Sequence, residues 1–269
     1  AAAAAAAGGK TEASGTAAAQ EDFKSSKWSL AELREYFGKV GRDYDLMMAR
    51  IKDLAVKTLL SVEPTVASTW HQGASFASLG TAPHVGPNQG CFEIFGFDVL
   101  VDDRLQPWLL EVNTFPSLSS SSPLDKRIKT RLVADAFTVS GLLPFDHDLV
   151  DKALKEDQTK RLQGLLPRCG PARSHSVQNV ASASLSDLGQ AEWQLILDTH
   201  DEFLRRGALE RIFPTPSTAR QYAQFFQAPR YANLVLARWL ECGGEACFRE
   251  GSNIDIPPWV PRQIFYEAT

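Results

Sequence analysis

The stretch "CFEIFGFDVLVDDRLQPWLLEVN", residues 91–113, has the pattern of a β-hairpin and decides the fold of this chain. Two apolar runs flank the loop "DDRLQ", as expected for two strands joined by a short connection. Both strands nevertheless carry polar side chains in their middle: Asp98 in the first, and Glu111 and Asn113 in the second. Carboxylates inside apolar strands are costly unless something compensates their charge, so these residues need an explanation.

Strand alternation predicts that the three polar side chains share one face of the hairpin. If the loop is centred between Arg104 and Leu105, Asp98 lies opposite Glu111, and Asn113 projects from the same side. The opposite face then carries five apolar residues that would pack on a core: Phe97, Val99, Val101, Leu110 and Val112.

Two interpretations of the polar face follow from the chemistry of its side chains. Like charges directly opposed across strands destabilise a sheet. Two carboxylates and an amide oxygen are, however, a suitable ligand set for Mg²⁺, and a bound cation would turn the repulsion into attraction. The alternative is a solvated sheet face that binds nothing.

Length and composition favour one sizeable core with a smaller appended unit. The chain has 269 residues, of which 44% are hydrophobic, and a formal net charge of -4. No apolar run approaches the roughly 20 residues that span a bilayer, and no basic and then apolar N-terminus marks a secretory signal. The mild acidity argues against wholesale nucleic-acid binding, so neither a membrane nor a nucleic acid is expected as a partner.

Four cysteines are too few for a disulfide framework and are typical of a reducing cytosol. Cys242 and Cys247 flank "GGEA", but no second Cys pair or nearby His completes a zinc set. We therefore interpret both as ordinary buried thiols. His84, in the loop "TAPHVGPNQG", is interpreted as an exposed side chain rather than part of a site.

Helices are predicted before the hairpin. Residues 1–26 are low in complexity and support no structural prediction. Ser29 followed by Glu32 forms a capping box that starts a first helix. A second helix is predicted over residues 44–60 from an apolar stripe at spacings of three and four: Tyr44, Met47, Met48, Ile51, Leu54, Ala55 and Leu59. The stretch 63–90, which contains several prolines and glycines, is predicted to be a loop.

Further helices are predicted after the hairpin. One covers residues 126–139, with Ser119–Ser122 as its cap, or alternatively as a phosphorylation site. Its core-facing residues would be Ile128, Leu132, Val133, Ala136 and Phe137. Residues 164–186 are predicted to be a flexible linker or insertion, and residues 187–269 a helical cap of three amphipathic segments. Its aromatic residues are expected in a core rather than on a partner-binding surface: Trp193, Phe203, Phe225, Phe226, Tyr231 and Trp239.

The hairpin and its continuation "TFPSL" closely resemble the tubulin tyrosine ligase-like family, whose members commonly read "CFE-x-x-GFD-x-x-x-D…PWLLEVN-x-x-PS". The segment "SKWSL" and the two helices after it resemble the family sequence that precedes this motif. The segments "SSSSPLDKRIKTRLVADAFTV" and "DEFLRRGALERIFPTPSTARQYAQFF" resemble the family sequence that follows it. Together these segments cover about half of the chain, in the expected order.

The resemblance implies an α+β fold, namely the C-terminal portion of an ATP-grasp domain over residues 27–163, followed by the helical region 187–269. It also implies a ligase that uses ATP to phosphorylate a carboxylate, after which an amine attacks the acyl phosphate. The family's Mg²⁺ ligands fall on Asp98, Glu111 and Asn113, in agreement with the hairpin pattern, and the last two would also contact ATP. No residue is matched to a catalytic acid or base.

The segment "SSSSPLD" most resembles the glutamate-adding branch of the family. The resemblance therefore implies a polyglutamylase that joins free glutamate to the acidic C-terminal tails of tubulin. Lys129 falls on a family position associated with the amino-acid substrate, and Arg127 and Arg131 either extend that site or form a solvated face. A cytoplasmic location on the microtubule cytoskeleton, including the cilium or basal body, follows from the resemblance and the lack of an export signal.

Two departures from the family pattern favour a rival interpretation. Phe115 stands where many glutamylases have Ser, close to Asn113. No upstream strands for an adenine pocket and no phosphate-gripping Lys and Arg are found, so the chain is expected to be part of a longer protein or to lack the nucleotide half. The rival is a non-catalytic, microtubule-associated structural member of the family.

Overall fold

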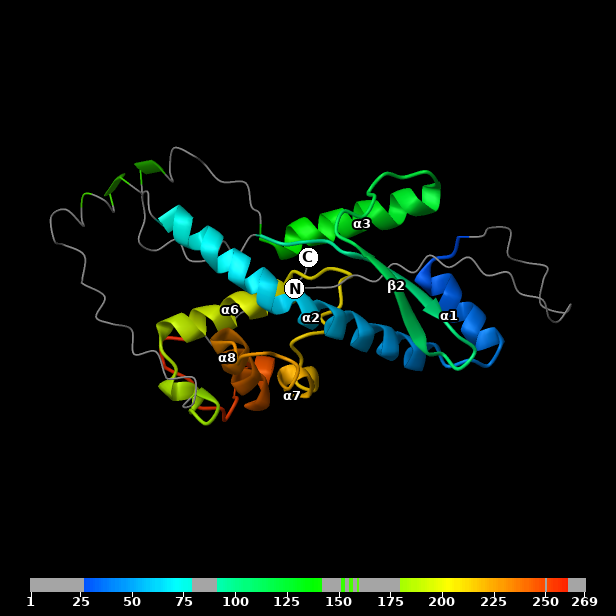
Figure 1. Cartoon of the computed structure of the whole chain (residues 1–269). Helices are drawn as coiled ribbons and strands as arrows, with labels where there is room; N and C mark the ends of the chain where they lie inside the picture. Colours follow the sequence, from blue (N-terminus) through cyan, green and yellow to red (C-terminus); the bar gives the residue numbers. More distant parts are fainter. Residues whose placement is uncertain are drawn as a thin grey trace, which may run out of the picture. The chain divides into compact units, whose positions relative to one another are not determined.

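The computed structural model describes residues 27–78, 91–141, 151–152, 155–156, 159, 180–249 and 251–260. The chain divides into two compact units. Unit 1 lies within Ala1–Asp135 and Ala208–Ala228, and unit 2 lies within Ala136–Gly207 and Pro229–Thr269. The predicted α+β class is confirmed, because helices accompany a two-stranded antiparallel sheet (Figure 1).

Helix α1, Leu30–Lys39, begins at the predicted capping box. The Ser29 hydroxyl accepts the Glu32 N–H at 3.2 Å, and the Glu32 carboxylate accepts the Ser29 N–H at 2.6 Å. These two bonds satisfy backbone donors that the first helical turn would otherwise leave unpaired. Leu33 and Phe37 then pack against the core of unit 1, so α1 covers one side of that core.

Helix α2, Tyr44–Ser78, supplies the centre of the unit 1 core with its first half. Met47, Ile51 and Ala55 are buried there together with Phe97 and Val99 of the hairpin. The other four residues of the predicted stripe pack against this cluster: Tyr44, Met48, Leu54 and Leu59. The prediction of this stripe is therefore confirmed, and Figure 1 shows the hairpin laid against this half of α2, with α1 beside it.

The second half of α2 passes through Pro64 and ends at Ser78, so the loop predicted from residue 63 onward is wrong over 63–78. Proline removes one backbone hydrogen bond from a helix. Between Pro64 and Ser78, however, only Gly73 adds a further helix-breaking residue, whereas the other prolines and glycines of the stretch fall in 79–90. Residues 79–90, with His84, lie outside the described residues.

The hairpin pairs β1, Gly96–Val101, with β2, Pro107–Asn113. Near the polar residues the register is the predicted one, with Asp98 opposite Glu111. Between Asp98 and Val99 the register shifts, so that Val99 faces Leu109 and Val101 faces Pro107. The shift leaves Leu110 as an extra residue in β2, with its side chain 64% exposed. The prediction that Leu110 faces the core is therefore wrong, whereas Phe97, Val99, Val101 and Val112 do face it.

The hairpin loop explains the shift. The Asp102 carboxylate accepts the backbone N–H groups of Arg104 and Gln106 at 2.9 and 2.8 Å, and the Trp108 indole N–H at 3.1 Å. Two arginines donate to the loop carbonyls: Arg42, just before α2, to that of Asp103 at 2.8 Å, and Arg50 of α2 to that of Arg104 at 2.7 Å. These bonds centre the loop on Arg104 rather than between Arg104 and Leu105, and the extra residue in β2 absorbs the difference.

Helix α3, Pro123–Val139, begins three residues before the predicted start, because the Ser122 hydroxyl caps it by accepting the Asp125 N–H at 3.1 Å. Capping by a serine of the Ser119–Ser122 run is confirmed. The predicted core face is wrong for Ile128 and Phe137, which are 44% and 51% exposed. The unit 1 core cluster is built by α1, α2 and the hairpin, and its members include no α3 residue.

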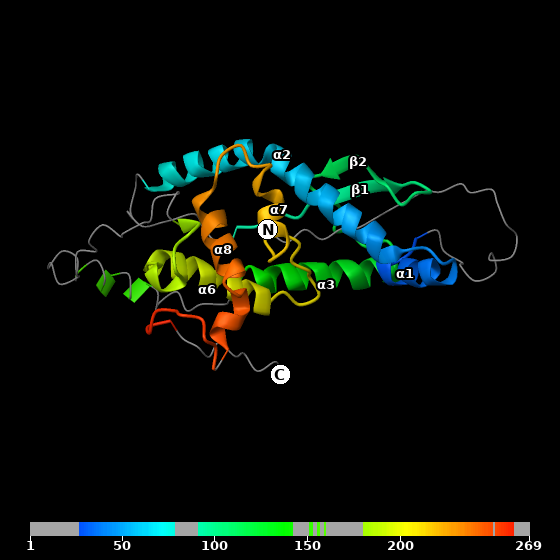
Figure 2. The ribbon, with the colours of Figure 1, turned by 90° about the horizontal axis from the view of Figure 1, so that it is seen from below.

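Unit 2 contains η1, Leu185–Asp187, α6, Gln190–Leu204, α8, Tyr231–Glu241, and η2, Gly244–Phe248. Helix α8 crosses α6 (Figure 2), and Trp193 and Trp239 are fully buried there. Val180 and Leu185 are also buried, so the last part of the stretch predicted as a linker packs into this core.

Helix α7, Thr218–Ala223, belongs to unit 1 rather than to a common cap with α6 and α8. The Tyr222 hydroxyl donates to Asp53 of α2 at 2.9 Å, and Lys52 pairs with Glu210 at 2.5 Å. The core prediction for the aromatic residues is confirmed for Trp193 and Trp239, whereas Phe225 is 46% exposed. No helix of the described part of the chain is long and apolar enough to cross a membrane.

Candidate metal centre and substrate-binding residues

The structure brings the three predicted metal ligands together. Asp98 and Glu111 are direct partners across the two strands, and Asn113 stands two residues beyond Glu111 on the same face. The Asn113 amide nitrogen donates to Glu111 Oε1 at 3.3 Å. This bond uses the nitrogen, so the amide oxygen is the ligand atom that Asn113 can offer to a cation.

The electrostatics of this polar face agree with a site for a cation. Burial raises the pKa of the Asp98 carboxyl, and a hydrogen bond to Glu111 and the negative charge of Glu111 raise it further. Within the described residues, no three His, Cys, Asp and Glu side chains gather into a group that could hold a metal ion, so the candidate set here consists of two carboxylates and the Asn113 amide. Two hard carboxylates and an amide oxygen fit Mg²⁺, which takes few protein ligands beside phosphates and water.

The segment after β2 approaches β1 closely at Gly96. A Cβ on Gly96 would lie 3.1 Å from the Pro116 Cβ and 3.5 Å from the Asn113 Cβ, so a larger residue would require Pro116 to shift by a few tenths of an ångström. Phe115, in that segment, is 91% exposed. Its side chain therefore projects away from the hairpin, two residues beyond Asn113.

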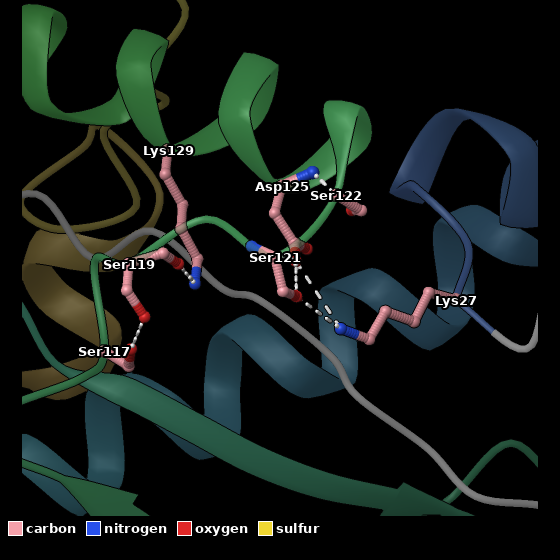
Figure 3. Close-up of polar contacts among 7 residues, drawn as sticks. All are labelled: Lys27, Ser117, Ser119, Ser121, Ser122, Asp125 and Lys129. Carbon is pink, nitrogen blue, oxygen red and sulfur yellow. Dashed lines mark hydrogen bonds and ion pairs between the residues drawn. The ribbon is translucent and has the colours of Figure 1, made fainter.

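Lys129, the predicted substrate residue, lies on α3 above the serine-rich segment that joins β2 to α3 (Figure 3). Its ammonium donates to the Ser119 carbonyl at 2.6 Å, and the Ser119 and Ser117 hydroxyls lie 2.8 Å apart. Among the described residues, no hydrogen bond or ion pair joins Lys129 to the three metal-ligand candidates. Lys129 and the polar face of the hairpin are thus two separate polar regions of unit 1.

The remaining candidates have structural surroundings. Arg127 and Arg131 are exposed, and Arg131 lies 3.8 Å from Asp135 one turn along α3, as in the solvated-face interpretation. Cys247 is buried and accepts the Trp239 indole N–H at 3.4 Å, which confirms it as a structural thiol. Cys242 is partly exposed.

Sequence reasoning missed residues that hold these regions together. Asp102, which fixes the hairpin loop, has a recognisable signal, because an Asp at the start of a loop often accepts backbone N–H groups two residues on. Lys27 and Asp125 also went unnoticed: the Lys27 ammonium lies 3.5 Å from the Asp125 carboxylate, across 98 positions of sequence. No local pattern predicts such a contact.

A model of the tubulin-tyrosine ligase family matches residues 9–149, which is more than half of the chain. The chain belongs to the tubulin-tyrosine ligase family. Three curated relatives that are similar to this chain are all named tubulin glutamylases. Tubulin monoglutamylase TTLL4 of Homo sapiens is 33% identical over 232 residues, which is 79% of this chain and 18% of TTLL4.

Tubulin polyglutamylase TTLL5 of Homo sapiens is 31% identical over 242 residues, 81% of this chain and 17% of TTLL5. Tubulin polyglutamylase ttll-5 of Caenorhabditis elegans is 34% identical over 220 residues, 73% of this chain and 29% of that protein. The chain therefore spans less than a third of the length of these relatives. The part of this ligase-family chain that the family model matches includes the hairpin and α3, and with them every predicted site residue.

Proposed function

We propose that this chain carries the metal-binding and amino-acid-binding residues of an ATP-dependent ligase that adds glutamate to tubulin. The observation that carries the proposal is the direct opposition of Asp98 and Glu111, with Asn113 bonded to Glu111, on the hairpin face turned away from the core. The similar relatives are named tubulin glutamylases, which supports glutamate and tubulin as the substrates.

The proposed reaction joins the side-chain carboxylate of a tubulin glutamate to the amine of free glutamate, while ATP is cleaved to ADP and phosphate by way of an acyl phosphate. Mg²⁺ bound with ATP would neutralise the charge of the phosphate oxygens during phosphoryl transfer. Asp98, Glu111 and Asn113 would hold this ion, and Glu111 and Asn113 would also adjoin the nucleotide. Opposed carboxylates with nothing else to compensate them would otherwise destabilise the hairpin.

Lys129 is proposed to hold a carboxylate of the free glutamate. Its ammonium is bound to a neutral backbone carbonyl, so its positive charge is not cancelled by that partner. An ammonium of this kind pairs with a carboxylate as a point charge, without the fixed geometry that an arginine would impose. We propose that these residues belong to the C-terminal part of an ATP-grasp fold. We further propose that the protein acts on cytoplasmic microtubules or in the cilium.

The proposal is tested with the protein encoded by the full transcript, incubated with unmodified microtubules, ATP, Mg²⁺ and isotopically labelled glutamate. Mass spectrometry of the tubulin tails is expected to show added glutamate, and Glu111→Gln is expected to abolish it. Glu35→Gln is the matched control, because Glu35 is an exposed carboxylate on α1, outside the hairpin motif. Microtubule co-sedimentation without glutamate addition, unchanged by Glu111→Gln, would instead support a structural family member.

A further inference from the structure

Asp125 and Lys129 stand four residues apart on α3, with the acid on the N-terminal side. This spacing and order ordinarily give an ion pair along a helix. The same arrangement on α2 does so, because Lys57 Nζ lies 2.8 Å from the carboxylate of Asp53. On α3 both side chains have other partners, and Figure 3 shows them turned to different parts of the serine-rich segment.

Asp125 is held by partners outside the helical turn that contains Lys129. Its carboxylate accepts the Ser121 hydroxyl at 2.7 Å and lies 3.5 Å from the Lys27 ammonium, while its own N–H is capped by Ser122. The hydrogen bond from Ser121, and then the charge of Lys27, lower the pKa of Asp125 to about 2. Asp125 is therefore an anion throughout the neutral range, and a nearby cation stabilises it.

Lys129 has a neutral partner instead. Its ammonium donates to the Ser119 carbonyl at 2.6 Å, beside the hydroxyls of Ser117 and Ser119. Among the described residues, the cation paired with Asp125 is Lys27, which reaches it from the segment before α1. Without Lys27, the cation that helical spacing offers to Asp125 is Lys129.

We propose that Lys27 is a positioning residue that holds Asp125 away from Lys129 and so keeps the Lys129 ammonium available for a carboxylate of the amino-acid substrate. This inference rests on the proposed role of Lys129 as the substrate-binding residue. In this proposal Lys27 contacts neither the substrate nor the metal. Its role is to pair with Asp125, which would otherwise compete with the anionic substrate for the Lys129 ammonium one helical turn away.

The test compares four variants of the full chain: Lys27→Met, Lys27→Arg, Asp125→Asn, and the double variant of Lys27→Met with Asp125→Asn. L-Glutamate is titrated into each and binding is followed by NMR, without ATP or tubulin, and KM and kcat for glutamate are measured separately in the tubulin assay. Far-UV circular dichroism checks that each variant is folded. Asparagine retains an oxygen that can accept the Ser121 hydroxyl, so Asp125→Asn removes the charge with little other change.

Lys27→Met is expected to weaken glutamate binding about two- to fivefold, the range of an exposed ion pair, and to raise KM equally while kcat is unchanged. Lys27→Arg should bind like the parent chain. Asp125→Asn should bind no more weakly, and adding it to Lys27→Met should restore the parent affinity. If the Lys27–Asp125 ion pair only stabilised the position of α3, the result would differ. Loss of Lys27, of Asp125 or of both would then weaken glutamate binding to the same extent.

Three results would overturn the inference: unchanged binding in Lys27→Met, weakened binding in Asp125→Asn, or a double variant as weak as Lys27→Met. If Lys27→Met does not fold, Asp125→Asn alone decides the matter, since weaker binding refutes the competition. If the four variants bind glutamate as expected but the protein does not modify tubulin, the proposed ligase function is overturned and this inference stands. Tubulin modification with no effect of Lys27→Met on KM would overturn this inference alone.

Discussion

Glu111→Gln is expected to stabilise the hairpin in the absence of a divalent cation while it removes the metal site. Asp98 and Glu111 are direct cross-strand partners, and Glu111 raises the pKa of Asp98 through a hydrogen bond and its charge. Like charges directly opposite each other destabilise a sheet, and we take the cost as similar in size to the about 0.2–1 kcal/mol that a favourable cross-strand pair contributes. Because both side chains are partly exposed to solvent, which screens them, we expect a gain of about 0.5 kcal/mol for the variant.

Hydrogen exchange of the β1 and β2 amides, read by mass spectrometry of peptides from this region, measures the free energy of local opening. In EDTA, 0.5 kcal/mol corresponds to roughly twofold slower exchange in Glu111→Gln than in the parent chain. With Mg²⁺ at about ten times its Kd the order should reverse, since the parent gains about 1.4 kcal/mol from the bound ion and the variant gains less. Glu35→Gln, at an exposed glutamate of α1 without an opposed carboxylate, serves as the control in both conditions.

The effect also has a defined dependence on pH. The folded-state pKa of Asp98 lies above its ordinary value, so the folded chain holds this proton more tightly than the unfolded chain does. The stability of the parent hairpin therefore falls as the pH rises through that raised pKa, and its difference from Glu111→Gln should vanish in acid. Faster exchange in Glu111→Gln than in the parent at neutral pH in EDTA would refute the electrostatic reasoning.

Three further predictions concern the scaffold of unit 1. Phe97→Ala, at a side chain only 3% exposed, should lower the free energy of unfolding by about 3–5 kcal/mol in urea denaturation, whereas Leu100→Ala, at 44% exposed, should cost far less. Ser29→Ala should lose about 1 kcal/mol through the α1 cap, seen as faster hydrogen exchange in the first turn of α1 without change in unit 2. Burial and the hydrogen bond to Asp53 raise the pKa of Tyr222 to about 12, so the parent should lose stability between pH 10 and 12 and Tyr222→Phe should lose less. Tyrosinate absorbance tests this, and equal alkaline sensitivity would contradict it.

The polar face of the hairpin could be predicted because strand alternation is a local rule. Once the strands are recognised, the pairing of Asp98 with Glu111 follows from their distances to the loop, and the core side of Phe97 and Val112 follows from the same count. The pairing nearer the loop could not be predicted in this way. Its register depends on how the Asp102 carboxylate is bonded, and a half-residue change in the loop centre is invisible in apolar periodicity.

Helix predictions failed where they depended on what lies outside the helix. An apolar stripe marks Ile128 and Phe137 of α3 as core residues, but the core of unit 1 is filled by α1, α2 and the hairpin. The helix α7 has an amphipathic sequence like those of α6 and α8, yet Tyr222 attaches it to α2. Periodicity identifies an apolar face, whereas the partner of that face is a property of the whole chain.

The same distinction separates the two polar regions of unit 1. The hairpin is one short segment that contains Asp98, Glu111 and Asn113, so their proximity could be predicted from the local sequence. The partner of Lys129 cannot be predicted from the local sequence. Helical spacing pairs Lys129 with Asp125, whereas in the structure Lys129 bonds to Ser119 and Asp125 pairs with Lys27. A contact made 98 positions away decides which of two nearby charges is balanced. For this reason a variant at Lys27, far in sequence from every predicted ligand, is the most informative change to make in the serine-rich segment and α3.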